Sequence, residues 1–181
     1  QTKVLIGREL ENKIKAMLDE AEDLVRQEKY SEAEKQLIEI ISLDVQNVSA
    51  YERLYNIYVV TKEYKQALQT AQFLLKLALR KNKQKLGHKQ QVASNVLRLA
   101  DVYINLGDVS KLLGQNDEAF ENYQQALEVE PNSPKNLDKN LEMSIILKQK
   151  SLAADLLARL EQVNPQNQKL REYGERIETL Q

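Results

Sequence analysis

The sequence predicts an all-α protein built from repeated helix–turn–helix units. Apolar residues recur at steps of three and four along most of the 181 residues, as they do on one face of a helix. Only five glycines and three prolines interrupt this pattern. In addition, residues 100–133 hold two helical patterns that are joined by a short polar turn. These three observations favour helices throughout the chain.

Segment 100–133 is the clearest of these units. The apolar face of its first helix is formed by Val102, Tyr103, Leu106, Val109, Leu112 and Leu113, and that of its second by Phe120, Tyr123 and Leu127. Gly107 also lies on the first face, although a glycine inside a helix costs about 1 kcal/mol relative to alanine. We therefore expect the second helix to approach closely there, where Ala119 and Ala126 are small too.

The ends of these helices carry their own signals. Gly114 is suited to end the first helix, and Asn116 to cap the second. Ser133 and Pro134 then form an N-cap followed by a proline at the first helical position. Another helix is therefore expected to begin directly after the segment.

This segment resembles the tetratricopeptide repeat (TPR), a 34-residue helix–turn–helix unit. The positions that match the family pattern are Tyr103, Leu106, Gly107, Ala119, Tyr123, Ala126 and Pro131. Ser110 departs from the pattern, because the family prefers tyrosine there. The resemblance implies a right-handed TPR α-solenoid that recognises other proteins.

The same spacing places three further repeats. Together with segment 100–133 it gives a single TPR domain over 1–181, with repeats at 14–47, 48–81 and 134–167 and a capping helix at 168–181. In the first repeat, Ser31 and Glu34 have the spacing of a capping box for the second helix. In the fourth repeat, Asn140 and Ser144 are polar departures from the family pattern.

Between the second and third repeats, 18 residues are inserted at 82–99. Helical periodicity continues into this insert from both sides, and residues 85–88 are the best turn candidate. Because 18 residues are close to five helical turns, each helix gains two or three turns. We predict lengthened helices at about 65–83 and 89–113, which form a protruding antiparallel hairpin.

Positive charge gathers around this insert. Residues 64–100 contain eight lysines and arginines and no acidic residue, although the net charge of the chain is −1. We call the end of the hairpin the basic tip, formed by Arg80, Lys81, Lys83, Lys85 and Lys89. It is either a solvated helix end or a contact for an acidic partner, an anionic lipid or nucleic acid. Nucleic acid is disfavoured, because residues 80–100 contain no Phe, Tyr or Trp that could stack on bases.

In the TPR family, the first helices of the repeats line a concave groove. Mixed polar and apolar side chains at the groove positions suit an extended peptide or a partner helix. The candidate groove residues are Glu52, Asn56, Asn105, Asp108, Lys111, Lys135, Lys139 and Glu142. Some TPR domains clamp a terminal carboxylate in this groove. Here Glu52 stands where the clamp has a cation, and Lys139 replaces an arginine, which argues against a clamp.

No residue pattern indicates catalysis. The chain has one histidine, no cysteine and no glycine-rich phosphate loop. His88 lies in the predicted turn, and a lone histidine makes neither a metal site nor an acid–base pair. We therefore expect no enzyme activity, no cofactor and no metal. No apolar run approaches the roughly 20 residues that a membrane span requires.

These features predict a non-catalytic scaffold or adaptor that binds a peptide or a partner helix in its groove. The alternative is a regulatory or targeting domain of a larger enzyme or membrane-anchored protein, because the sequence begins with Gln1 rather than Met. We favour a cytoplasmic location and leave open an anchor or signal upstream. The identity of the partner, the oligomeric state and the choice between groove and basic tip also stay open.

Overall fold

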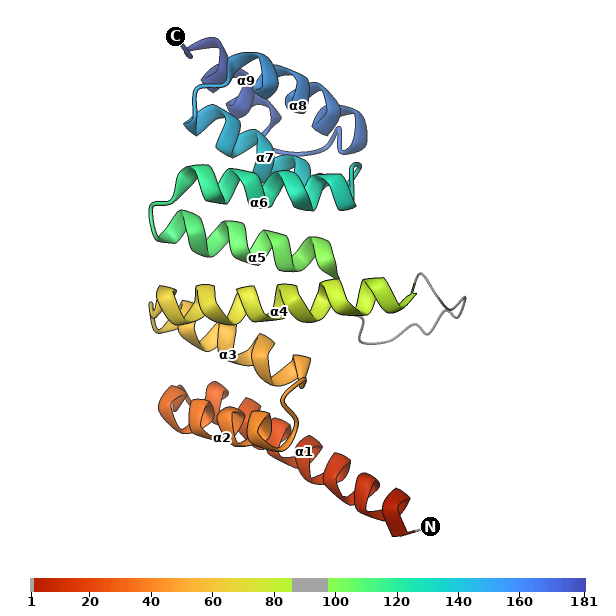
Figure 1. Cartoon of the computed structure of the whole chain (residues 1–181). Coiled ribbons are helices and arrows are strands. Elements are labelled where there is room, and N and C mark those ends of the chain that lie inside the picture. Colours follow the sequence, from red (N-terminus) through yellow and green to blue (C-terminus); the bar gives the residue numbers. More distant parts are fainter. Residues whose placement is uncertain (1, 86–97) are drawn as a thin grey trace. The chain divides into compact units, whose positions relative to one another are not determined.

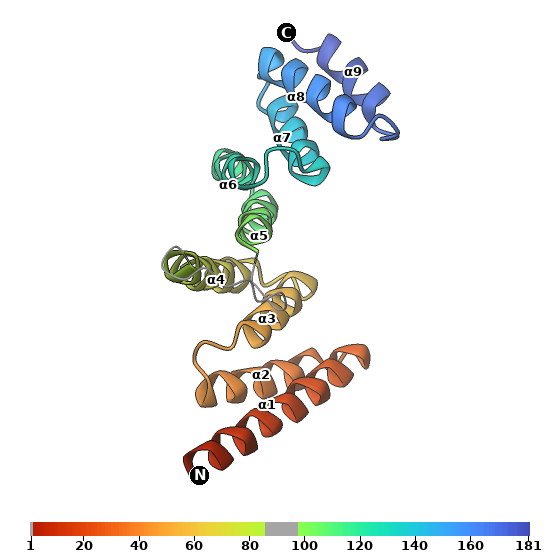
Figure 2. The ribbon, with the colours of Figure 1, turned by 90° about the vertical axis from the view of Figure 1, so that its right-hand side faces the viewer.

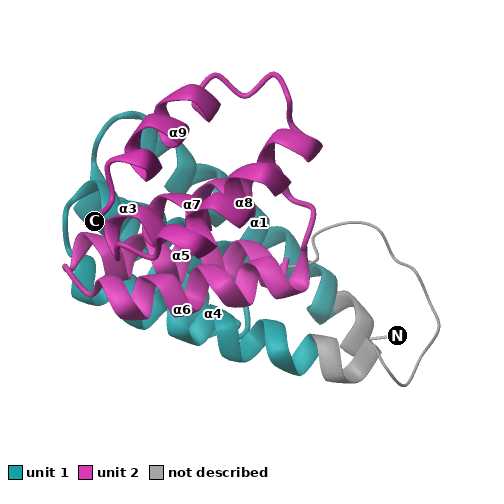
Figure 3. Ribbon diagram, turned by 90° about the horizontal axis from the view of Figure 1, so that it is seen from above, with its two compact units in different colours: residues 1–81 teal, residues 82–181 magenta. Residues whose placement is uncertain are grey.

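The computed structural model describes residues 2–85 and 98–181, with side chains described for 6–81 and 98–181. Within these ranges there are nine helices and no strand, which confirms the all-α prediction. The chain divides into two compact units, residues 1–81 and 82–181 (Figure 3). The single domain over 1–181 stays a prediction.

Unit 1 contains two helical hairpins. The first pairs α1 (Thr2–Arg26) with α2 (Tyr30–Leu43), and the second pairs α3 (Val48–Val60) with α4 (Tyr64–Lys85) (Figure 1). Alanines at the helix contacts are fully buried, so the backbones approach closely. The large buried side chains of this core include Met17, Leu37, Ile40, Leu54, Tyr58 and Leu74. Burial of a large apolar side chain contributes about 1.5–3 kcal/mol, which makes this face the main stabilising feature of the hairpins.

Unit 2 continues the pattern with two hairpins and a terminal helix. Its helices are α5 (Leu99–Leu112), α6 (Asn116–Val129), α7 (Pro134–Ile146), α8 (Lys150–Val163) and α9 (Leu170–Glu178). One buried cluster joins α5 and α6 to Met143 of α7. A second cluster joins α7 and α8 to Tyr173 and Ile177 of α9. Helix α9 lies beside α8 and covers the end of the last hairpin (Figure 2).

The turns between the paired helices share one backbone conformation. Each contains a residue with positive φ, namely Glu28 (59°) and Lys62 (64°) in unit 1 and Gly114 (76°) and Lys148 (57°) in unit 2. Within each unit the two residues are 34 apart in sequence. Gly114 follows the end of α5 as predicted, and it is the one of the four in which the left-handed conformation is free of Cβ strain.

Gly107 is the point where α5 and α6 approach most closely, as expected. A Cβ atom built on Gly107 would lie 2.5 Å from Cδ1 and 2.9 Å from Cζ of Tyr123 on α6. The close neighbour is thus an aromatic ring, although Ala119 and Ala126 are fully buried too. Only a residue without a side chain leaves room for this ring.

Three local predictions were wrong or incomplete. Helix α2 begins at Tyr30, so Ser31 lies inside the helix and does not cap it, and Glu34 accepts a hydrogen bond from the Tyr58 hydroxyl on α3 (2.7 Å). Asn116 is the first residue of α6 and does not cap it. Helix α5 begins at Leu99 after the extended residue Arg98, so it is not lengthened towards residue 89 in one piece.

Two other predictions around the insert can be compared with the structure. Helix α4 has 22 residues, against 13 or 14 in α3, α5 and α6, which confirms its lengthening. Lys85, placed in the predicted turn, is still helical. The rest of that turn, with His88, and the segment 89–97 lie outside the described residues.

The polar departures of the fourth repeat face the interior. Asn140 and Ser144 are at most 1% exposed on α7, and a further asparagine of this helix, Asn136, is 2% exposed. Asn136 Nδ2 donates to the Ala126 carbonyl (3.0 Å), and Asn140 Nδ2 donates to the Tyr123 carbonyl (2.7 Å). These amides therefore tie α7 to the backbone of α6. Ser133 caps α7 by accepting from the Asn136 amide nitrogen, with Pro134 as its first residue, as predicted.

Candidate binding surfaces

Unit 1 has a cleft on the face formed by its first helices. It has a volume of about 420 Å³. Six of its residues come from α1 and α3 at positions that face the groove in TPR proteins. The lining residues are Glu22, Val25, Tyr30, Glu52, Arg53, Asn56, Ile57 and Val60. The structure thus places the two predicted groove residues of unit 1, Glu52 and Asn56, in one cleft.

The cleft combines an apolar wall with a charged edge. Val60 is 58% exposed although it is a large apolar residue at the end of α3. At the edge, Glu22 accepts hydrogen bonds from Arg26 (2.7 Å) and from Arg53 of α3 (3.4 Å). Mainly because of the hydrogen bond from Arg26, the pKa of Glu22 is lowered, so this carboxylate is ionised at neutral pH.

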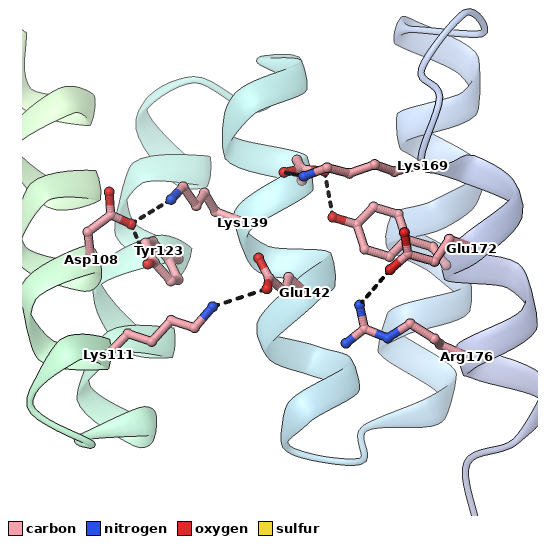
Figure 4. A network of polar contacts seen from close by, with 10 residues as sticks. Asp108, Lys111, Tyr123, Lys139, Glu142, Lys169, Glu172 and Arg176 are labelled. Atoms are coloured by element: carbon pink, nitrogen blue, oxygen red, sulfur yellow. Dashed lines mark hydrogen bonds and ion pairs between the residues drawn. The ribbon is translucent and has the colours of Figure 1, made fainter.

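In unit 2, the predicted groove residues pair with one another (Figure 4). Lys139 Nζ on α7 lies 2.7 Å from Asp108 Oδ1 on α5, and Lys111 Nζ on α5 lies 3.1 Å from Glu142 Oε1 on α7. Lys135 of α7 pairs with Asp101 of α5 (3.3 Å). The charges on these two helices therefore neutralise each other across the interface.

Two tyrosine hydroxyls extend this network. Tyr123 donates to Asp108 Oδ1 (2.5 Å), and Tyr173 of α9 donates to Asp138 Oδ1 (2.7 Å), which also pairs with Lys169 (Figure 4). Burial, and then the hydrogen bond to Asp138, raise the pKa of Tyr173. The roles of these two hydroxyls were not predicted. These hydrogen bonds have a sequence signal, which is a tyrosine at a core position together with a carboxylate on the neighbouring first helix.

These ion pairs affect whether unit 2 could clamp the terminal carboxylate of a ligand. Both lysines that such a clamp would use in unit 2, Lys135 and Lys139, already bind carboxylates of α5. A ligand carboxylate would have to compete with Asp101 and Asp108 for them. Asn105 lies on α5 between these two acids. The geometry of unit 2 therefore agrees with the sequence argument against a clamp.

The basic tip is described in part. Arg80 and Lys81 are exposed on α4, as are Lys65 and Lys76 further back on the same helix. None of these four residues has an interaction partner among the described residues. Side-chain positions are not described for Lys83 and Lys85, and Lys89 lies outside the described residues. The described part is a helix surface with positive charge and no acid.

Two further findings concern other kinds of site. Among the described residues, no group of three or more histidine, cysteine or acidic side chains is arranged to hold a metal ion. In the same part of the chain, no helix has the length and hydrophobicity that crossing a membrane requires.

Comparison with known proteins identifies the repeat. The sequence model of the tetratricopeptide repeat matches residues 100–133. No curated protein matches the chain.

Solved structures of TPR proteins resemble the fold. MamA from Desulfovibrio magneticus RS-1 has a TM-score of 0.63 at 16% identity, over 86% of this chain and 77% of its own. YrrB, described as a TPR protein with an unusual peptide-binding site, has a TM-score of 0.59 at 19% identity, over 91% of this chain and 84% of its own. A TPR protein from Parabacteroides merdae has a TM-score of 0.73 at 16% identity, over 92% of this chain and 59% of its own.

At these identities the likeness concerns the fold. It agrees with the helix pairs described above. The chain is therefore a protein of tetratricopeptide-repeat fold, and its residues 100–133 are a tetratricopeptide repeat by sequence as well.

Proposed function

We propose that this chain is a non-catalytic scaffold or adaptor that binds a peptide or a partner helix in the groove formed by its first helices. The observation that carries the proposal is the cleft of unit 1. It brings residues of α1 and α3 together around Val60, which is 58% exposed. Exposed apolar surface with a polar rim is typical of a recognition site.

The lining residues indicate what the partner presents. Val25, Ile57 and Val60 would contact an apolar side chain of the partner. Asn56 is exposed next to them, and its amide can both donate to and accept from a peptide backbone. The bound segment is therefore expected to carry one apolar anchor and to expose its backbone near Asn56, as peptides do in grooves of this kind.

Peptide selection tests this proposal. Random peptides are displayed against the full chain, and the affinity of a selected peptide is measured by titration calorimetry. Val60→Asn replaces the apolar contact by an amide. Because part of a valine contact is lost and a polar group is buried, we expect the dissociation constant to rise about tenfold, which corresponds to ~1.4 kcal/mol.

Val45→Asn is the matched control. Val45 is 63% exposed, close to the exposure of Val60, but it lies in the turn after α2 and does not line the cleft. This variant should bind the peptide as the wild type does. If every selected peptide binds the Val60 variant with unchanged affinity, the groove of unit 1 is not the site.

The exposed cations of α4 support a second contact, to an acidic partner. Lys65, Lys76, Arg80 and Lys81 lie on one helix, α4, whose own sequence contains no acidic residue. An acidic peptide such as polyglutamate should bind the wild type more tightly than Arg80→Gln/Lys81→Gln, and the difference should shrink as salt rises. Equal binding of both proteins in low salt would indicate a solvated helix end instead.

A further inference from the structure

A second cleft lies in unit 2, away from the groove residues. It is formed between α6 and α8, and it has a volume of about 720 Å³. Its lining contains none of the candidate groove residues. Asn140 is the residue of α7 that also lines this cleft. The cleft is thus separate from the surface discussed above.

Asn140, one of the residues that line this cleft, has an unsatisfied buried acceptor. The residue is 1% exposed, and its Nδ2 donates to the carbonyls of Tyr123 (2.7 Å) and Asn136 (2.9 Å). These two bonds fix the orientation of the amide, because exchanging its oxygen and nitrogen would set an oxygen against two carbonyls. Asn140 Oδ1 has no hydrogen-bond partner among the described residues. A buried acceptor without a partner is unfavourable, so a donor from outside would stabilise it.

The walls of the cleft suit a long side chain with a charged end. Leu127, Leu152 and Leu156 supply apolar surface. Glu121 and Glu128 are exposed on α6, and neither has an interaction partner in the described part of the chain. Arg159 also lines the cleft, but its Nη2 donates to the Pro131 carbonyl (2.9 Å), which holds it at one edge.

We propose that the α6–α8 cleft binds a lysine or arginine side chain of a partner protein. An N–H of the cation donates to Asn140 Oδ1, and its methylene stem packs on the leucines, as long basic side chains do on apolar surface. Glu121 and Glu128 balance the positive charge. This contact in the α6–α8 cleft goes beyond the groove proposal and does not depend on it.

Nuclear magnetic resonance of the full chain tests the proposal with two small probes. N-acetyl-arginine amide carries the cation, and N-acetyl-citrulline amide has nearly the same shape without the charge. We expect the arginine probe to shift the side-chain amide signals of Asn140 and the backbone signals of α6 and α8. The citrulline probe should bind these sites about fivefold more weakly, since exposed ion pairs contribute modestly.

Charge variants test whether the arginine probe binds through the glutamates of the cleft. Glu121→Gln/Glu128→Gln should weaken binding of the arginine probe about fivefold. The matched control is Glu118→Gln/Glu161→Gln, which changes two exposed glutamates of α6 and α8 outside the cleft and should leave binding unchanged. Asn140→Ala should remove the localised shifts, and a thermal denaturation curve shows whether this variant is folded.

Three outcomes would overturn the proposal. The arginine probe could leave the cleft signals unshifted, which would mean that Oδ1 is satisfied by water only. Both probes could bind with equal affinity, which would exclude a role for charge. The two double variants could weaken binding equally, which would indicate a general attraction to the acidic surface rather than a site.

Discussion

Replacing Gly107 by alanine should destabilise unit 2, although alanine is the better helix former. The new Cβ would lie 2.5 Å from Tyr123 Cδ1 and 2.9 Å from Cζ, whereas carbon atoms prefer separations of about 3.5–4.0 Å. Tyr123 has little freedom to retreat. It is 1% exposed, and its hydroxyl donates to Asp108 Oδ1 at 2.5 Å.

The expected magnitude follows from three terms of different sign. Alanine gains about 1 kcal/mol over glycine inside a helix. Overpacking costs about 1–3 kcal/mol. Displacing the ring also weakens its hydrogen bond to Asp108, for which we take ~1.5 kcal/mol, the low end for charged acceptors, because Asp108 is about one-third exposed. With the middle of the overpacking range, the net loss is about 2.5 kcal/mol, which would lower the Tm of a unit of this size by roughly 10–20 °C.

The assay is thermal and urea denaturation followed by circular dichroism, with hydrogen exchange at α5 and α6. Hydrogen exchange is needed because repeat arrays do not always unfold in one step. Gly7→Ala is the control, since nothing lies within 4 Å of a Cβ at this helical position, and it should leave stability unchanged or raise it. Tyr123→Leu removes the ring, so Gly107→Ala should be less harmful in that background.

One result would refute this reasoning. If Gly107→Ala has the same Tm as the wild type or a higher one, Tyr123 moves aside without loss. The glycine would then have no packing role, and its match to the repeat pattern would need a different explanation.

Two further predictions concern single contacts. Ser133→Ala should lower the free energy of unfolding by about 1 kcal/mol, because it removes the side-chain cap of α7. Ser31→Ala is the control and should have little effect, because α2 has no side-chain cap. Equal losses for the two variants in urea denaturation would contradict the observed caps. The raised pKa of Tyr173 means that the unfolded chain loses this proton first above about pH 10, so stability should fall as pH rises past that value. Tyr173→Phe should lose less stability than the wild type between about pH 9 and pH 11, and parallel losses would show that Tyr173 is not responsible.

The helix pairs could be predicted because their signals are repeated and redundant. Many positions at fixed spacing mark segment 100–133, and burial of Ala119, Tyr123 and Ala126 shows why those positions are restricted. The caps were less predictable, because a local signal competes with tertiary contacts. Ser31 and Glu34 have the spacing of a capping box, but α2 already begins at Tyr30, so Ser31 lies inside the helix, and Glu34 accepts from the Tyr58 hydroxyl on α3.

Four of the charge pairs between helices could have been found from the sequence by a rule that the structure reveals. Adjacent first helices place a residue of one repeat against a residue 31 positions later. The pairs at this spacing are Glu22–Arg53, Asp108–Lys139, Lys111–Glu142 and Asp138–Lys169. The spacing is the 34-residue repeat less three, because the two helices are offset by nearly one turn. The groove positions were assigned one helix at a time, and this relation between helices was missed.

The ion pairs distinguish the groove surface of unit 2 from that of unit 1, although both surfaces are formed by the same positions of their repeats. In unit 2, Asp108, Lys139 and Glu142 are about one-third exposed and already have partners, so a ligand would have to replace each contact with one of similar strength. In unit 1, the Glu22–Arg53 pair (3.4 Å) lies at the edge of the cleft, whereas Val60 is 58% exposed, and covering Val60 releases water. We therefore propose that binding is more favourable at the unit 1 cleft. We infer that the unit 2 charges fix the register of α5, α7 and α9, while unit 1 supplies the recognition surface of the groove.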